Sequence, residues 1–243
     1  KTVSSIISLR PRGWVLPTNS PVAIAISFDL WDAFLEQTMG SGRSLRAEIR
    51  QRLAPFSYPP NMPLLKAALD AIREMITRNA RFTPDQQQAV IAALSIFDPQ
   101  RKIRFRSSTN VEDSESFTGA GLYDSYSGCL ADDLDNDSAG PCRCDPEETN
   151  ERGVFRAIQK VYASFYNDNA FLERLRHGID ENQVGMALLV HHSTPDEFEM
   201  ANGVATVRKE GASYSGELVT QAGAVSVSNP DGNARPEIVT ASK

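Results

Sequence analysis

A strand pattern that runs directly into a long polar loop constrains this chain more than any other feature. The alternating segment 102–106 (KIRFR) is typical of a β-strand, and residues 107–121, rich in Ser, Thr, Asp, Glu and Gly, follow it. Small residues leave backbone N–H groups accessible, and an arginine beside such a turn supplies a planar donor fork. The pattern therefore predicts a site for an anion such as a polyphosphate. The alternative is a solvated loop, and spacing alone does not decide between the two.

The composition indicates an ordinary globular protein. The chain has 243 residues, enough to bury a sizeable core, with 41% hydrophobic and 23% charged residues. Its net charge of −6 and scattered Lys and Arg argue against a nucleic-acid-binding surface. No apolar stretch is long enough to span a membrane and no signal peptide is visible, so we expect a cytoplasmic protein. Because the chain starts at Lys1 without Met and stops at Lys243, we expect a fragment.

Two clusters resemble metal sites without completing one. Cys129, Cys142 and Cys144 lack a second cysteine pair or a histidine cluster, so we expect incidental thiols and leave the role of Cys142 and Cys144 open. The acidic run 132–137 has the alternation of a calcium loop, but Ser138 stands where that loop needs Gly, and Cys144 stands where it needs Glu. We expect a solvated acidic loop.

The order of expected elements predicts an α+β fold. Capping patterns at Thr83 and Asp145 mark two helix starts. Helices are expected at 28–39, 44–53, 61–76, 83–97, 145–165 and 170–177. Strands are expected at 22–26, 102–106, 122–130, 183–192, 203–207, 216–220, 224–227 and 237–240. Helices thus precede a strand-loop-strand unit, a helix pair and a mainly antiparallel sheet, without a repeated βαβ unit. We divide this one domain into a helical scaffold (1–100), a phosphate-loop and helix-pair part (101–182) and a sheet (183–243).

The polar loop resembles a known signature. Arg106-Ser107-Ser108 with Glu112-Asp113, then Phe117-Thr118-Gly119 and Asp124-Ser125-Tyr126, is similar to the N-terminal nucleotide-binding domain of phosphoenolpyruvate synthase and pyruvate phosphate dikinase. The similarity continues through 161–167, 178–187 and 202–205, and upstream through 15–35, so it covers most of the chain in order.

This resemblance implies an ATP-grasp fold, in which two α+β lobes clamp ATP with Mg²⁺. The family's enzymes transfer a phosphoryl group from ATP to a histidine of a separate domain and from there to pyruvate. By this likeness Arg106 is the catalytic residue and holds phosphate oxygens. The implied nucleotide-binding residues are Arg106, Ser107, Ser108, Gly119, Gly121 and Ser125 at the phosphates, Leu189, Val190, His191 and His192 along the adenine, and Glu217 and Gln221 in the later sheet. The implied partners are the phosphohistidine domain and the phosphoenolpyruvate/pyruvate domain, in the full-length protein or in a partner chain.

Departures from the family pattern keep a second interpretation open. The family's Gly-Gly-Lys segment should precede Lys1, and its Glu and Gln-x-Arg, which hold metal and phosphates, should follow Lys243, so we expect the metal ligands outside this chain. His191 and His192 stand where Gln and a basic residue are usual. The alternative to an enzyme domain is a non-catalytic module for nucleotide sensing or domain docking. We expect the isolated fragment to be inactive.

Overall fold

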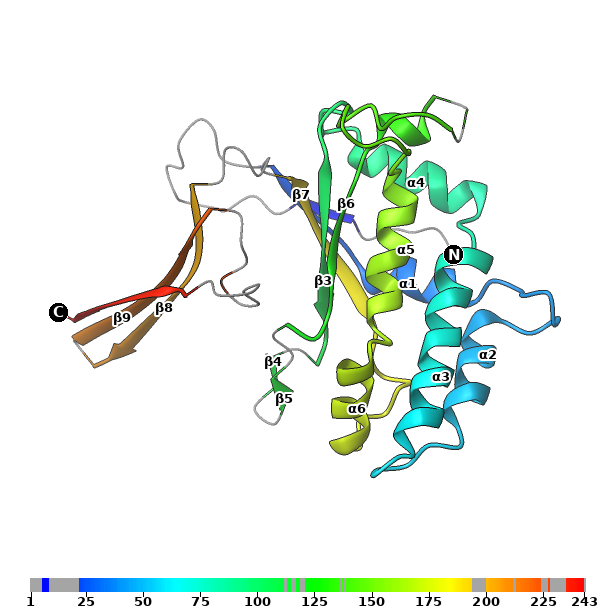
Figure 1. The fold of residues 1–243 in the computed structure, drawn as a ribbon, viewed down its shortest axis with the longest axis horizontal. Coiled ribbons are helices and arrows are strands. Elements are labelled where there is room, and N and C mark those ends of the chain that lie inside the picture. Colours follow the sequence, from blue (N-terminus) through cyan, green and yellow to red (C-terminus); the bar gives the residue numbers. More distant parts are fainter. Residues whose placement is uncertain are drawn as a thin grey trace. The chain divides into compact units, whose positions relative to one another are not determined.

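The chain forms two units, each of which is described by itself. The computed structural model describes residues 6–8, 22–111, 113–114, 117–118, 121–135, 137, 139–193, 200–211, 213–223, 227 and 235–242. The first unit comprises Lys1–Ser193 and the second Thr194–Lys243 (Figure 1). The fold is the mixed α+β architecture expected from the sequence.

A five-stranded antiparallel sheet forms the frame of the first unit. Its strands lie in the order β1-β2-β7-β3-β6. Their bounds are Ile6–Ser8 for β1, Ala23–Ile26 for β2, Ile103–Thr109 for β3, Ser125–Gly128 for β6 and Met186–His192 for β7. The strand on which the sequence argument rests, β3, therefore lies between β7 and β6.

Helices cover one face of this sheet (Figure 1). They are α1 (Phe28–Leu35), α2 (Leu45–Leu53), α3 (Met62–Glu74), α4 (Pro84–Leu94), α5 (Val154–Ser164) and α6 (Asp168–Arg176). The centre of the core is aromatic: Trp31 meets Tyr162 edge-on at 5.0 Å between ring centroids, and Phe34 and Phe105 are also fully buried. Such ring pairs add to the stabilisation that burial already provides.

A π-helical turn continues α3. This turn, η1, spans Met75–Asn79 and changes the hydrogen-bonding pattern at the end of the helix. The buried side chain of Gln159 in α5 donates from Nε2 to the carbonyl oxygens of Ile76 (3.0 Å) and Ala80 (2.8 Å). A side chain distant in sequence therefore satisfies the backbone at the end of η1.

A buried ion pair joins α6 to the segment that precedes β7. The Arg174 side chain is 0% exposed and pairs with Glu181 at 2.6 Å between Nε and Oε1. Its guanidinium also donates to the Tyr123 hydroxyl (3.3 Å) and lies 3.8 Å from the centroid of the Phe165 ring. The charge is buried with its partners in place, as burial of a charge requires.

The helix ends confirm several sequence predictions and correct others. The capping box at Thr83 is present, with reciprocal bonds to Gln86. The first expected helix stops at Leu35 instead of continuing to Met39, because the chain turns back there and the Met39 N–H donates to the Arg43 carbonyl (2.7 Å). Strand β6 is shorter than the expected strand 122–130, since it begins at Ser125.

The helix start predicted at Asp145 is wrong. The helix begins at Val154, and residues 145–152 form turns. The Asp145 carboxylate instead pairs with Lys102 from the segment before β3. The N-terminal N–H of α5, at Val154, donates to the carboxylate of Asp133. The Asp145 carboxylate also accepts from the Glu147 N–H (3.1 Å), so it forms a local turn, while α5 begins at a cap that is distant in sequence.

The first part of the acidic run is packed and not solvated, whereas Asp137 is exposed. Asp132 is 3% exposed and accepts hydrogen bonds from the backbone N–H groups of Arg143 (2.8 Å) and Arg152 (2.7 Å). Asp133 caps α5, and burial raises its pKa to about 6. The carboxylates fold the segment between β6 and α5 onto itself, which the local sequence does not reveal.

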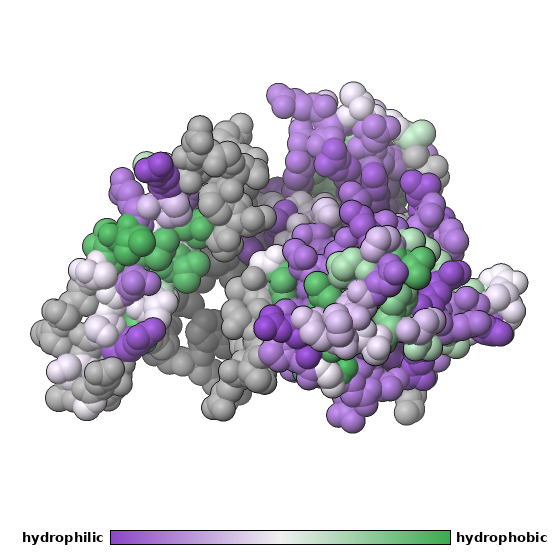
Figure 2. All heavy atoms as spheres, turned by 60° about the horizontal axis from the view of Figure 1, so that its bottom comes forward, coloured by the Kyte–Doolittle hydropathy of each residue, from purple (hydrophilic) through white to green (hydrophobic). Residues whose placement is uncertain are grey.

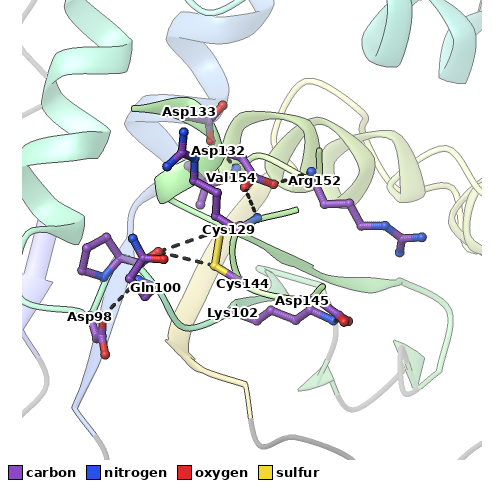
Figure 3. Close-up of a disulfide and its surroundings, with 12 residues drawn as sticks. Asp98, Gln100, Lys102, Cys129, Asp132, Asp133, Cys144, Asp145, Arg152 and Val154 are labelled. Carbon is purple, nitrogen blue, oxygen red and sulfur yellow. Dashed lines mark hydrogen bonds and ion pairs between the residues drawn. A yellow bond between two sulfur atoms is a disulfide. The ribbon is translucent and has the colours of Figure 1, made fainter. Parts of the chain in front are cut away.

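The expectation of three incidental thiols is also wrong. A disulfide joins Cys129 to Cys144, with a Cα–Cα distance of 5.8 Å, while Cys142 is a buried free thiol (Figure 3). The three sulfur atoms lie within 4.8 Å of one another. The fold brings them together because the Cys129 N–H donates to the Arg152 carbonyl (2.7 Å), which returns the loop to the end of β6.

The second unit is a three-stranded antiparallel sheet. Its strands β8 (Ala201–Glu210), β9 (Ser213–Ala222) and β10 (Glu237–Ser242) lie in the order β10-β9-β8. In the expected strand 224–227, residues 224–226 lie outside the described residues, and Val227 is in a bend. None of the described side chains of this unit is buried, and Figure 2 shows apolar side chains gathered on its visible face. The exposed large apolar residues of this unit are Met200, Val204, Val207, Leu218, Ile238 and Val239.

Candidate functional site

The large sheet has a second face, opposite the helices, on which several predicted residues meet. Strand residues alternate between faces, and Phe105 and Val190 lie in the core while their neighbours along the strands do not. The register pairs Arg106 with Leu189 of β7 and with Ser125 of β6. We call the face that carries Arg104, Arg106, Ser108, Ser125, Leu189 and His191 the open face.

Arg106 is held at the centre of the open face by a histidine. Its Nε–H donates to His191 Nε2 at 2.9 Å, and His191 Nδ1 lies 2.7 Å from the backbone carbonyl of His192. This pattern requires a neutral imidazole with its proton on Nδ1. Burial, followed by the charges of Arg106 and Arg104, lowers the His191 pKa. His191 therefore orients the guanidinium without adding charge.

The other predicted adenine-side residues divide between the two faces. Leu189 is half-buried on the open face, whereas Val190 is fully buried in the core. His192 lies at the end of β7, where its ring meets Phe97 edge-on at 5.1 Å and its Nε2 accepts from the Asp98 N–H (3.2 Å). The structure thus brings Leu189 and His191 together with Arg106, and it places Val190 and His192 elsewhere.

The predicted phosphate loop has structure of its own. Ser108 shares the open face with Arg106, while Ser107 lies on the opposite face. Beyond β3, strands β4 (Asp113–Ser114) and β5 (Phe117–Thr118) form a short antiparallel ladder. Gly121 has φ +78°, a conformation that favours glycine, and Gly119 lies outside the described residues.

Contacts that the sequence did not predict anchor this loop. The Asp124 N–H donates to the hydroxyl of Ser164 in α5 (3.0 Å), and the Asn167 amide donates to the carbonyl of Leu122 (3.3 Å). Asn110 bridges β3 to β7, since it donates to the Gln183 carbonyl (2.8 Å) and accepts from the Gly185 N–H (3.1 Å). No local pattern marks these contacts, although the motif itself contains Asn110.

Arg104 is a further residue that the sequence analysis did not assign to the site. It lies two positions before Arg106 on the same face and opposite His191 in the register. Its Nη1 is 3.4 Å from the Ser127 hydroxyl oxygen. The alternation of 102–106 could have indicated it, because Arg104 and Arg106 share one side of the strand.

The last two predicted residues belong to the second unit. Glu217 is exposed and Gln221 half-buried on β9, and their spacing of four places both on one face of that strand. The Gln221 Oε1 atom is buried without a hydrogen-bond partner among the described residues. The two residues share a face with Val219, opposite Val204 of β8.

Two groups of potential metal ligands occur in the described part of the chain, and neither includes a predicted nucleotide-binding residue. One is the cysteine trio, and the other is Asp135, Asp137 and Glu151, whose carboxylate oxygens lie within 4.8 Å of one another. The hydrogen bond that the protonated Glu151 carboxyl donates to Asp137 is the main cause that raises the Glu151 pKa to about 7. On the strands of the large sheet, no described open-face position is Asp or Glu.

No helix among the described residues combines the length and the apolar character that crossing a bilayer requires. The cytoplasmic location stays a prediction. The disulfide is a feature more common in oxidising compartments.

Comparison with known proteins gives one result that bears on this geometry. The model of the family described as pyruvate phosphate dikinase, AMP/ATP-binding domain, matches residues 16–228. A search of curated proteins found no match. The matched range includes β3, β7 and most of the second unit's sheet, so it contains every predicted site residue. It supports a nucleotide-binding role and agrees with an ATP-grasp-like fold. The chain therefore belongs to the family of the AMP/ATP-binding domain of pyruvate phosphate dikinase.

Proposed function

We propose that this chain is the ATP-binding domain of a dikinase-type phosphotransferase. In this proposal a phosphoryl group of ATP passes to a histidine of a separate domain and from there to pyruvate. The observation that supports it best is the placement of Arg106, held by His191 in the middle of an open face that also presents Ser108 and Ser125.

The open face suits the demands of phosphoryl transfer. That reaction depends on positioning and on neutralising the charge of the phosphate oxygens more than on covalent help from side chains. Arg106 and Arg104 supply positive charge on one side of β3, and the hydroxyls of Ser108 and Ser125 supply neutral donors beside Arg106. We assign the phosphates to this group and the adenine to the neighbouring surface of Leu189 and His191.

The family's Mg²⁺ would neutralise further phosphate charge when bound. Carboxylate oxygens are its preferred protein ligands, and the described open-face positions carry none. The described open-face residues therefore do not form a magnesium site by themselves. The work that we assign to this chain is binding and orientation of the nucleotide by Arg106 and its neighbours.

Calorimetry with a non-hydrolysable ATP analogue tests the proposal on the full-length protein. Replacing Arg106 by Ala should weaken binding by about 1.5–3 kcal/mol, or tenfold and more, because a charge-assisted hydrogen bond is lost. The control is Arg78→Ala, since the Arg78 side chain is 76% exposed on η1. Equal affinity of the Arg106 and Arg78 variants would refute the assignment of Arg106.

A non-catalytic nucleotide-binding module is the second candidate. One observation favours it: His191 is neutral and already engages Arg106, so this side of the site carries less charge than a basic residue would give. Incubation of the full-length protein with labelled ATP and the histidine-bearing domain separates the two. Labelled phosphohistidine supports the transferase, whereas nucleotide binding without transfer supports the module.

A further inference from the structure

A pocket lined by five cationic side chains lies at the outer edge of β6. It has a volume of about 180 Å³ and is bordered by Lys102, Arg104, Arg152, Arg156 and Lys160. We call it the β6 pocket. Arg104 borders both this pocket and the proposed phosphate group of the open face, whereas Arg106, Ser108, Ser125, Leu189 and His191 do not line the pocket. The β6 pocket is therefore a neighbour of the phosphate group that shares one arginine with it.

The local charge of the β6 pocket is opposite to that of the whole chain. Lys102 pairs with Asp145, and Arg152 pairs with Glu148. For Arg156 and Lys160, the described residues provide no acidic partner within ion-pair distance. On a chain of net charge −6, this leaves positive charge concentrated at one place. An anion would neutralise it.

The Lys160 ammonium is held inside this positive environment. It lies 5.0 Å from the centroid of the Tyr126 ring, a cation–π contact. Burial, followed by the charges of Arg156 and Arg152, lowers the Lys160 pKa. The repulsion between these like charges is a cost that a bound anion would remove.

The backbone of β6 contributes to the same pocket. Strand β6 is the last strand of the sheet order, so its outer edge is not paired with another strand of the sheet. Gly128 allows α5 to approach this edge, because a Cβ there would lie 2.7 Å from the Val154 Cα. The pocket is bordered by Ser127 and Gly128 together with the first turns of α5. Hydroxyl and edge backbone groups of this kind complement the charged side chains in anion recognition.

The volume of the β6 pocket indicates the size of ligand that fits inside it. Its volume of about 180 Å³ holds several water molecules. Pockets for drug-sized ligands begin at about 300 Å³, so the space inside this pocket suits a small anion. We propose that the β6 pocket binds a small polyvalent anion, such as an organic phosphate or a di- or tricarboxylate, beside the proposed nucleotide site, with which it shares Arg104.

The disulfide loop forms one wall of this site. Cys129 and Cys142 border the pocket, and Lys102 with Asp145 on one side and Arg152 on the other flank the Cys129–Cys144 bond (Figure 3). The disulfide joins the loop to the end of β6. It thereby holds Asp145 near Lys102, with which Asp145 pairs.

The proposal is tested by titrating the full chain with citrate and, separately, with pyrophosphate. The amide NMR signals of residues 126–128 report the binding. Both probes should shift these signals, and Arg156→Glu with Lys160→Glu should weaken binding by at least about tenfold, because two charge-assisted contacts become repulsive. Lys160→Arg keeps the charge and should retain binding. Citrate binding alone or pyrophosphate binding alone would identify the carboxylate or the phosphate class as the ligand.

Two controls make the result specific. Arg78→Glu introduces the same charge change on exposed η1 and should leave binding intact. Arg106→Ala should weaken binding of the ATP analogue and leave citrate binding intact, so failure of the nucleotide proposal and failure of this one are distinguishable. If the double variant unfolds, Lys160→Met alone replaces it. The proposal is overturned if neither probe shifts these signals, or if charge reversal in the pocket has no more effect than reversal at Arg78.

Discussion

The two sheets of this protein are built from similar sequence patterns, yet only one of them has a core. Leu188 on β7 is 0% exposed, whereas Leu218 on β9 is 41% exposed. The large sheet is covered by helices on one face, and in the small sheet no described side chain is buried. Alternation therefore identifies a strand, but the burial of its apolar side chains depends on what the rest of the chain supplies.

The largest expected effect comes from one substitution made in both sheets. Leu188→Ala should lower the free energy of unfolding by about 2–5 kcal/mol, since it leaves a cavity in a packed core. Leu218→Ala should cost less than about 1 kcal/mol, because its side chain is already partly in water. Denaturant unfolding of the two variants measures both values. Equal losses would mean that the small sheet is covered in solution as completely as the large one.

The buried ion pair offers a second contrast, because only a unit with a core can bury a charge. Glu181→Ala leaves Arg174 buried without its carboxylate and should cost about 3 kcal/mol. The matched control is Glu173→Ala, whose carboxylate pairs with the exposed Arg176, and it should cost less than about 1 kcal/mol. Thermal unfolding of both variants measures the two losses of stability. A similar loss in each would show that the Arg174 side chain is accessible to water.

A covalent link holds the loop at the edge strand of the large sheet, and no disulfide occurs among the described residues of the small sheet. The Cys129–Cys144 disulfide closes a loop of 15 residues at the end of β6, and a loop of that length is worth about 3 kcal/mol of stability. Cys129→Ser with Cys144→Ser should lose this amount. A reductant should destabilise the original protein and leave the double variant unaffected. The assigned pairing is wrong if the reductant lowers the stability of the original protein and of the double variant equally. As a control, Cys142→Ala should be destabilised by the reductant as much as the original protein is.

The smallest effect concerns pH and the cap of α5. Burial raises the Asp133 pKa in the folded state to about 6, above its value in the unfolded chain, so the folded state binds the proton more tightly. The stability from this proton is complete below about pH 4 and is lost as pH rises through 6. Between pH 4 and pH 7 the free energy of unfolding of the original protein should fall by on the order of 1 kcal/mol more than that of Asp133→Asn, once solvent screening is considered. Unfolding midpoints at both pH values measure this, and parallel pH profiles would contradict it.

Local signals in the sequence predicted the elements well. The Thr83 capping box and the alternation through Phe105 were confirmed, because each involves residues that are neighbours in the chain. The α+β class and the family also followed from the sequence. The face of β3 on which Arg106 lies was implied by the same alternation.

Long-range contacts were the part that the sequence could not reveal. Asp145 had the local pattern of a cap, but it pairs with Lys102, which lies 43 residues earlier in the chain. The Cys129–Cys144 pair and the burial of Asp132 both depend on the return of the loop to β6. The hydrogen bond between Arg106 and His191 joins residues 85 positions apart. In each of these cases the contact partner is distant in sequence and becomes a neighbour only in the folded chain.

The contact between Gln159 and the π-helical turn η1 has a consequence for the order of folding. The carbonyls of Ile76 and Ala80 receive their donor from α5, 83 and 79 residues later in the chain. During synthesis from the N-terminus, α3 can form early, but its final turn has no such donor until α5 emerges. Contacts of this separation are slow to close. The end of α3 should therefore gain its protection from hydrogen exchange together with α5 and after the first turns of its own helix.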